Sequence, residues 1–313
     1  MAANVESMFS VRETPWHNQG LVIQDAPSSE EAIKLAGLDW KVEGRPVYDA
    51  FGREIPGYKL NVRTSDNTNL GIVTDRYKIV QNSEAFAFTD ELLGQGVKYE
   101  TAGSLASGKR VWLLAKLAGT KICGDDFENY LVFSNTHDGT GSIKVAVTPV
   151  RVVCQNTLNL ALQKANRKWA CAHKGNMESK LEEAKFTLSN AETYQEELIE
   201  TLETMNQEMI SVTDVKDIIA QLLPMPVAVN GVEPTQRQIT GIEELRDELF
   251  LRYSQAPDLK AMANNHYRVI NAVTDFVAHT EPKRRTKNFD DNRFISIVDG
   301  HPIVDKAFKL LAA

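Results

Sequence analysis

The chain has 313 residues and a formal net charge of −7, with 42% hydrophobic and 25% charged residues, as expected of a globular protein. This length accommodates one large domain or two ordinary ones, and no apolar run approaches the roughly 18 residues that span a bilayer. The N-terminus lacks the basic and apolar regions of a secretory signal. The chain has three cysteines, Cys123, Cys154 and Cys171. They are odd in number and far apart, which favours reduced thiols and a cytoplasmic setting.

The negative charge is concentrated in one segment. Met177–Asp217 contains eleven acidic and three basic residues, a net charge of −8, so the remainder of the chain carries +1. The overall charge therefore does not exclude a polyanionic partner elsewhere on the surface.

The N-terminal half alternates between helical and strand patterns. Ser28 and Glu31 have capping-box spacing and begin a predicted helix over Ser28–Leu38. Further predicted elements are a strand over Asp39–Tyr48, a hairpin of Gly57–Thr64 and Asn69–Val80, a helix over Ser83–Leu93, and strands over Val97–Leu105, Arg110–Leu117, Tyr130–Thr136 and Ser142–Val153. Because Pro149 has no N–H to donate, the last strand should bulge or reach an edge there. These patterns predict an antiparallel α+β domain over residues 1–170.

From Asn156 onward the spacing of apolar residues changes from that of a strand to that of a helix. The apolar residues that define the first stripe, at steps of four, three and four, are Leu158, Leu162, Ala165 and Trp169. A second apolar repeat over Met177–Met209 extends for more than four heptads, which is typical of a coiled-coil seam. A long helix folded back on its own domain would show the same pattern.

A Pro- and Gly-rich loop over residues 223–235 follows this acidic segment. Beyond it, helical patterns occupy Gln236–Ser254, Asp258–Thr280 and Pro302–Leu311. We therefore predict a mainly helical lobe over residues 171–313.

Three motifs have the residue types of a catalytic or ligand site. Gly103–Arg110 resembles a phosphate-binding loop, but Arg110 replaces the metal-binding Ser or Thr and a strand follows, so a hairpin turn is favoured. Cys171 and His173 lack the other ligands of a structural zinc site, and we interpret them as a buried thiol and a surface histidine. His137 and Asp138 have the chemistry of a base and its orienting acid, in a loop whose sequence also suits an ordinary turn. We predict no catalytic residue, no metal site and no cofactor, with an enzyme centred on His137 and Asp138 as the third alternative.

Basic residues gather around the predicted hairpin and the helix after it. Between Gly139 and Lys180 there are seven basic residues and one acidic residue. Phosphate backbones reward such clustering through counterion release, and aromatic rings on the strands could stack on unpaired bases. The predicted nucleic-acid contacts are Lys144, Arg151, Lys164, Arg167, Lys168 and Lys174, with Trp112 and Tyr130 as stacking platforms. A solvated basic face, or one covered by the acidic helix after it, would give the same pattern.

Five segments resemble a family of phage- and plasmid-encoded proteins of unknown function. They are Phe9–His17 (FSVRETPWH), Gly71–Phe86, Tyr99–Leu117, Tyr130–Leu158 and Asn271–His279. The resemblance covers nearly the whole chain and implies an origin in a bacterial virus, prophage or plasmid and a bacterial cytoplasm. It supplies no activity or site residue. The chain departs from it at Trp169–His173, which lacks an arginine beside the histidine.

A second resemblance is architectural. The predicted helix, antiparallel strands and helix over Ser83–Trp169 are similar to the core of Rad52-type single-strand annealing recombinases. Those proteins form rings and hold single-stranded DNA in a basic groove. Likeness at this level is an analogy of fold.

Together these observations favour a nucleic-acid-binding protein of a phage or other mobile element. We expect a role in replication or recombination, with single-strand DNA annealing as one form of it, and a homo-oligomer with no membrane partner. The alternative is a non-enzymatic anti-defence or host-interaction protein that works through protein contacts, with the acidic helix as its surface.

Overall fold

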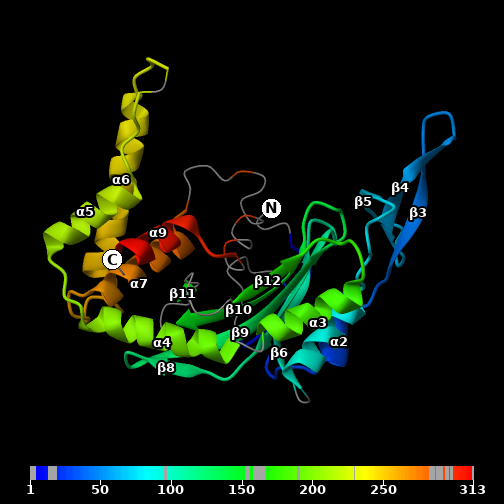
Figure 1. Ribbon diagram of the computed structural model, residues 1–313, viewed down its shortest axis with the longest axis horizontal. Helices are drawn as coiled ribbons and strands as arrows, with labels where there is room; N and C mark the ends of the chain where they lie inside the picture. Colours follow the sequence, from blue (N-terminus) through cyan, green and yellow to red (C-terminus); the bar gives the residue numbers. More distant parts are fainter. Residues whose placement is uncertain are drawn as a thin grey trace.

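The computed structural model describes residues 5–12, 20–94, 97–151, 156–157, 167–188, 191–228, 230–281, 286, 292, 296 and 299–311. Within them lie eight helices and two β-sheets, which confirms a mixed α+β fold. A three-stranded sheet projects from one end of the molecule, and α5, α6, α7 and α9 gather at the other (Figure 1). No helix in the described ranges is both long and apolar enough to cross a bilayer.

The main sheet has nine strands in the order β11-β10-β9-β7-β6-β1-β2, with β12 paired to β10 and β8 to β9. Neighbouring strands are antiparallel, except that β1 and β2 run parallel. The strands are β1 (Val5–Val11), β2 (Leu21–Ile23), β6 (Tyr99–Leu105), β7 (Arg110–Lys116), β8 (Thr120–Ile122), β9 (Asp125–Thr136), β10 (Ile143–Arg151), β11 (Asn156–Thr157) and β12 (Lys168–Cys171). The strands predicted over Val97–Leu105, Arg110–Leu117, Tyr130–Thr136 and Ser142–Val153 correspond to β6, β7, β9 and β10, which pair as antiparallel neighbours.

The segment that resembles a phosphate-binding loop is a hairpin turn, as predicted. It joins β6 to β7, and Ala106, Ser107 and Gly108 all adopt positive φ angles of 53°, 59° and 81°. A strand follows the turn, so no helix N-terminus is available to bind phosphate.

The small sheet, which we call the arm, spans Val42–Thr74. Its strands are β3 (Val42–Tyr48), β4 (Glu54–Arg63) and β5 (Asn69–Thr74), in that order and antiparallel. The hairpin predicted around residues 65–67 joins β4 to β5.

Helices α1 (Ser29–Leu35), α2 (Asn82–Leu93) and α3 (Met177–Leu188) share one hydrophobic core with the main sheet. The predicted capping box forms at α1, where the Ser28 N–H donates to the Glu31 carboxylate at 3.0 Å. From the sheet, alternate residues of β7, β9 and β10 enter this core, including Leu113, Phe133 and Val145.

A second core lies among the C-terminal helices. These are α4 (Ala191–Gln207), α5 (Val212–Leu222), α6 (Gln236–Gln255), α7 (His266–His279) and α9 (Pro302–Leu311). Ile122 and Phe127, from β8 and β9, join this core, so the main sheet supports the helical lobe at its far end. The predicted loop over residues 223–235 lies between α5 and α6.

Two predicted helices need correction. The segment from Asn156 was expected to be helical, but β11 and β12 occupy its ends, and residues 158–166 lie outside the described ranges. Lys168–Cys171 pairs with the edge of β10, and Trp169 enters the main core opposite Val145. The helix expected from Asp258 begins at His266, because the Asn265 side chain accepts the Arg268 N–H at 2.9 Å and caps it.

Two further predictions concern the acidic heptad segment and Pro149. The acidic heptad segment contains α3 and α4, with residues 189–190 between them outside the described ranges, so a continuous seam helix stays a prediction. At Pro149 the β9–β10 register runs through without a bulge. On the other side of β10, the β12 pairing ends at Ala146 and the β11 pairing begins at Val150, so Pro149 lies between them.

Candidate functional site

Strand register brings four of the predicted contact residues onto one face of the main sheet. Directly opposed residues of paired strands share a face. Lys144 lies opposite Ala170 on β12 and Ser134 on β9, and Ser134 lies opposite Trp112 on β7. By the same register Lys168 and Tyr130 lie on this face, which we call the polar face. It points away from α1, α2 and α3, whose core uses the alternate residues.

Two lysines of the polar face converge on one carboxylate. Lys144 Nζ lies 2.5 Å from Asp299 Oδ2, and Lys168 Nζ lies 3.6 Å from Asp299 Oδ1. Lys168 Nζ also donates to the Asp299 carbonyl oxygen at 3.3 Å. The side chains of Lys168 and Asp299 are 48% and 28% exposed, so solvent reaches this cluster. Two ammonium groups around one carboxylate leave a local excess of positive charge.

The two predicted stacking residues are buried. Trp112 is 7% exposed and packs with Met8 and Leu105, while Tyr130 is 9% exposed and its hydroxyl donates to the Glu128 carboxylate. On the polar face the lysine side chains are therefore accessible to solvent, whereas the rings of Trp112 and Tyr130 are buried.

The remaining predicted contacts lie elsewhere. Arg167 is 7% exposed, and its Nη1 donates to the Val147 carbonyl at 3.4 Å. Burial lowers the pKa of Arg167 below its usual value. Lys174 is exposed in the loop after β12. Lys164 and the side chain of Arg151 lie outside the described part of the chain, so the basic helix face that the sequence predicted is not among the described elements.

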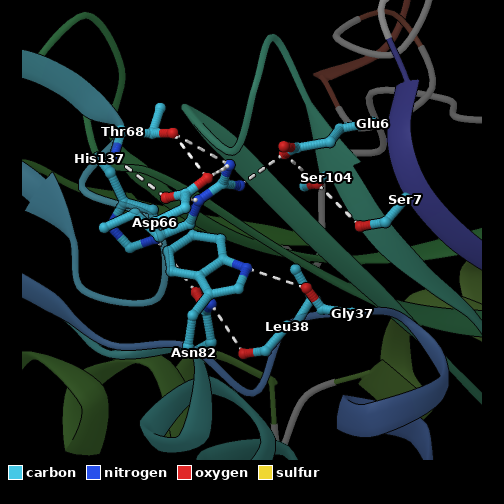
Figure 2. A network of polar contacts seen from close by, with 11 residues as sticks. Glu6, Ser7, Gly37, Leu38, Asp66, Thr68, Asn82, Ser104 and His137 are labelled. Carbon is cyan, nitrogen blue, oxygen red and sulfur yellow. Dashed lines mark hydrogen bonds and ion pairs between the residues drawn. The ribbon is translucent and has the colours of Figure 1, made fainter.

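A polar network that the sequence did not predict joins the arm to β1 (Figure 2). The Arg63 guanidinium is 2.8 Å from Glu6 Oε2 and 2.6 Å from Asp66 Oδ2, with its side chain only 9% exposed. Its carbon Cζ lies 5.4 Å from the centre of the Trp40 ring. The ion pair holds the pKa of Asp66 well below its usual range. Arg63 and Glu6 are far apart in sequence, and no local motif marks their contact.

His137 is fully buried beside this network. Its Nε2 lies 3.1 Å from Asn82 Oδ1, and its ring meets the Trp40 ring edge-on at 5.4 Å between centroids. Burial lowers the pKa of His137 to about 3. The Asp138 carboxylate instead accepts the Thr140 N–H at 2.9 Å, which is the bonding of an Asx turn.

His173 was expected at the surface, and this is wrong. It is 3% exposed, stacks on the Tyr77 ring with 4.4 Å between centroids, and places Nδ1 2.9 Å from the Lys78 carbonyl oxygen. Its neighbour Cys171 is a half-buried free thiol. No group of three or more His, Cys, Asp or Glu side chains suited to a metal ion occurs among the described residues.

Comparison with known proteins shows one similarity. Residues 69–297 match a family described as "Domain of unknown function (DUF932)", which covers α2, most of the main sheet and the helical lobe as far as α7. Neither curated proteins nor solved structures give a match. Because the match spans well over half of its length, the chain belongs to this family of unknown function, DUF932.

Proposed function

We propose that the protein binds single-stranded nucleic acid on the polar face, with Lys144 and Lys168 contacting phosphates. The observation that supports this most directly is their convergence on Asp299 from two adjacent strands. A pair of ammonium groups that holds one carboxylate has the charge and spacing to hold a phosphate.

Asp299 then occupies the position of a phosphate, and binding exchanges one anion for another. A polyanion gains because it also releases its condensed counterions, which a single carboxylate does not. Lys174, exposed after β12, would extend the contact along the backbone.

The role we propose for this binding is replication or recombination of a mobile element, with strand annealing as one form. It is supported by the sequence resemblance to phage- and plasmid-encoded proteins. Lysine contacts to phosphates leave base edges free, which is what pairing with a complementary strand requires. The buried Trp112 and Tyr130 rings would stack on bases only if the polar face opens.

The test is fluorescence anisotropy with a labelled single-stranded oligonucleotide at low ionic strength. A Lys144→Ala/Lys168→Ala variant should bind at least tenfold more weakly than the wild type, equivalent to about 1.4 kcal/mol. The matched control is Lys34→Ala/Lys121→Ala, which removes two exposed lysines that are also ion-paired, with Glu30 and Asp126. Absence of binding by the wild type, or equal binding by both double variants, would overturn the proposal.

A further inference from the structure

Exposed apolar side chains are concentrated on the arm. Five of the fourteen large apolar residues that are exposed in the described part of the chain belong to it. They are Tyr48 (56%), Phe51 (83%), Ile55 (37%), Tyr58 (49%) and Ile72 (59%). Scattered exposed apolar residues are normal, but a cluster on one small sheet marks an interaction surface.

One face of the arm is already used within the chain. Asn61 Nδ2 donates to the His137 carbonyl at 2.7 Å, and Lys59 Nζ donates to the Tyr77 carbonyl at 2.8 Å. Beside them, a Cβ added at Gly71 would lie 2.6 Å from Asp138 Cα, so the backbones are in close contact. This face, the docked face, fixes the arm to the main body.

The opposite face, the open face, carries Tyr58 and Ile72 of these five residues. Leu60 lies opposite Ile72 on β5 and Arg45 on β3, and Tyr58 lies opposite Thr74, so register places all of them together. Tyr58 and Ile72 are each about half exposed, at 49% and 59%. The arm also extends beyond the rest of the molecule (Figure 1).

The turn at the tip of the arm is ordered around an exposed ring. The Asp49 carboxylate accepts the Phe51 N–H at 2.8 Å and the Arg53 N–H at 3.0 Å. The Arg53 guanidinium lies 5.3 Å from the centre of the Phe51 ring. Hydrogen bonds therefore hold Phe51 in an exposed position where it can act as an anchor.

The charge of the arm selects the class of partner. Val42–Thr74 contains four basic and four acidic residues, and its arginines are ion-paired within the chain: Arg45 with Glu43, Arg53 with Asp49, and Arg63 with Glu6 and Asp66. A polyanion would gain little from cations that are already neutralised. The chain as a whole carries −7, whereas the charges of the arm sum to zero, so two copies repel each other less at the arm than over the rest of their surface.

We infer that the open face of the arm binds a second copy of this chain, with Tyr58 and Ile72 at the centre of the contact. The outer edge of β5 has no strand partner among the described residues, so its backbone groups can add to the pairing. This contact is separate from the polar face and does not depend on nucleic-acid binding. It places the self-association of the protein on the arm and not on the acidic α3–α4 segment.

Multi-angle light scattering after size exclusion tests the inference over a series of concentrations. The wild type should approach twice the monomer mass, and Tyr58→Thr/Ile72→Thr should raise the dimer dissociation constant at least tenfold. Threonine keeps the strand preference of both positions, and circular dichroism of the variant should match the wild type. The control is Val227→Thr/Val232→Thr, which removes two apolar side chains that are 76% and 72% exposed in the α5–α6 loop.

Three outcomes would overturn the inference. The wild type could remain monomeric throughout, or the arm variant could associate as strongly as the wild type. The arm variant could also lose oligonucleotide binding at a concentration where the wild type is monomeric, which would make the open face a nucleic-acid surface. If Lys144→Ala/Lys168→Ala loses oligonucleotide binding but keeps its mass, the two surfaces are independent.

Discussion

Arg63 on the arm forms an ion pair with Glu6 on β1 of the main sheet. It contacts carboxylates on both sides and covers the Trp40 ring, while its own side chain is 9% exposed. Such a charge is tolerated away from water only because its partners remain in place, so the arm and β1 depend on each other through it.

We expect Arg63→Met to lower the free energy of unfolding by about 2–3 kcal/mol, because it leaves Glu6 without its cation and removes the contact with Trp40. Arg45→Met breaks an exposed pair with Glu43 on the same sheet and should cost less than about 1 kcal/mol. Urea unfolding of both variants gives the comparison. If both variants lose the same free energy of unfolding, the buried ion pair of Arg63 contributes no more than the exposed pair of Arg45.

Because His137 is buried, the free energy of unfolding should decrease as the pH is lowered. Its pKa is about 3 in the folded protein because of burial, against an ordinary 6.5, so the unfolded chain binds the proton first as pH falls. The stabilisation is complete above pH 6.5 and is lost progressively between 6.5 and 3. By about pH 5 the loss should be about 2 kcal/mol.

Urea unfolding between about pH 7 and about pH 5 measures this loss, and His137→Gln should reduce the slope by up to about 1.4 kcal/mol per pH unit. His279→Gln, at an exposed histidine that contacts Asp275, is the control. If the free energy of unfolding of the wild type does not decrease as the pH is lowered, this would contradict the buried state of His137.

At the scale of elements, the arm is positioned by a close contact between backbones. A Cβ at Gly71 on β5 would meet Asp138 Cα at 2.6 Å, whereas one at Gly44 on β3 would meet only the side chain of Lys59, at 2.9 Å. The first neighbour is backbone and cannot move without shifting the β9–β10 turn, while the second is a carbon of a long side chain that is held only at its Nζ, by the Tyr77 carbonyl.

Gly71→Ala should therefore destabilise the protein by about 2–3 kcal/mol through overpacking. Gly44→Ala should be close to neutral, because alanine also lowers the entropy of the unfolded chain. Thermal unfolding of the two variants separates these effects. A Gly71→Ala protein as stable as the wild type would mean that the arm is not held at this contact.

The elements that could be predicted from the sequence are those fixed by local signals. The Ser28–Glu31 capping box, the β4–β5 hairpin and the amphipathic helix at Pro302–Leu311 depend on residues close together in the chain. The strand at Lys168–Cys171 could not be predicted, because its pairing with β10 is set by long-range contacts that outweigh a helical pattern.

The same distinction applies to the candidate site. Lys144 and Lys168 were predicted from charge alone, and register does bring them onto one face, but their partner Asp299 is 155 residues from Lys144. Arg63 with Glu6 and His137 with Asn82 join positions 57 and 55 residues apart, so no spacing in the sequence indicates them. Burial of His173 and Arg167 is equally a property of the folded chain.

For the molecule as a whole, two surfaces carry the two proposals. The polar face of the main sheet carries the lysines for nucleic acid, and the arm at one end carries the apolar contact for a second copy (Figure 1). If both proposals hold, a dimer joined through the arms presents two polar faces, one from each copy. Two strands held in this way could meet, as annealing requires.

The central claim is that Asp299 occupies the position of a phosphate, and the salt dependence of binding tests it most directly. The measurement is oligonucleotide affinity over a range of salt concentrations for the wild type, Asp299→Asn and Lys144→Ala/Lys168→Ala. Asp299→Asn should bind more tightly than the wild type because it removes the competing anion. The lysine variant should reduce the slope of log K against log salt by about 1.4, which corresponds to two lost phosphate contacts on a single strand. Weaker binding by Asp299→Asn together with an unchanged slope in the lysine variant would contradict the account.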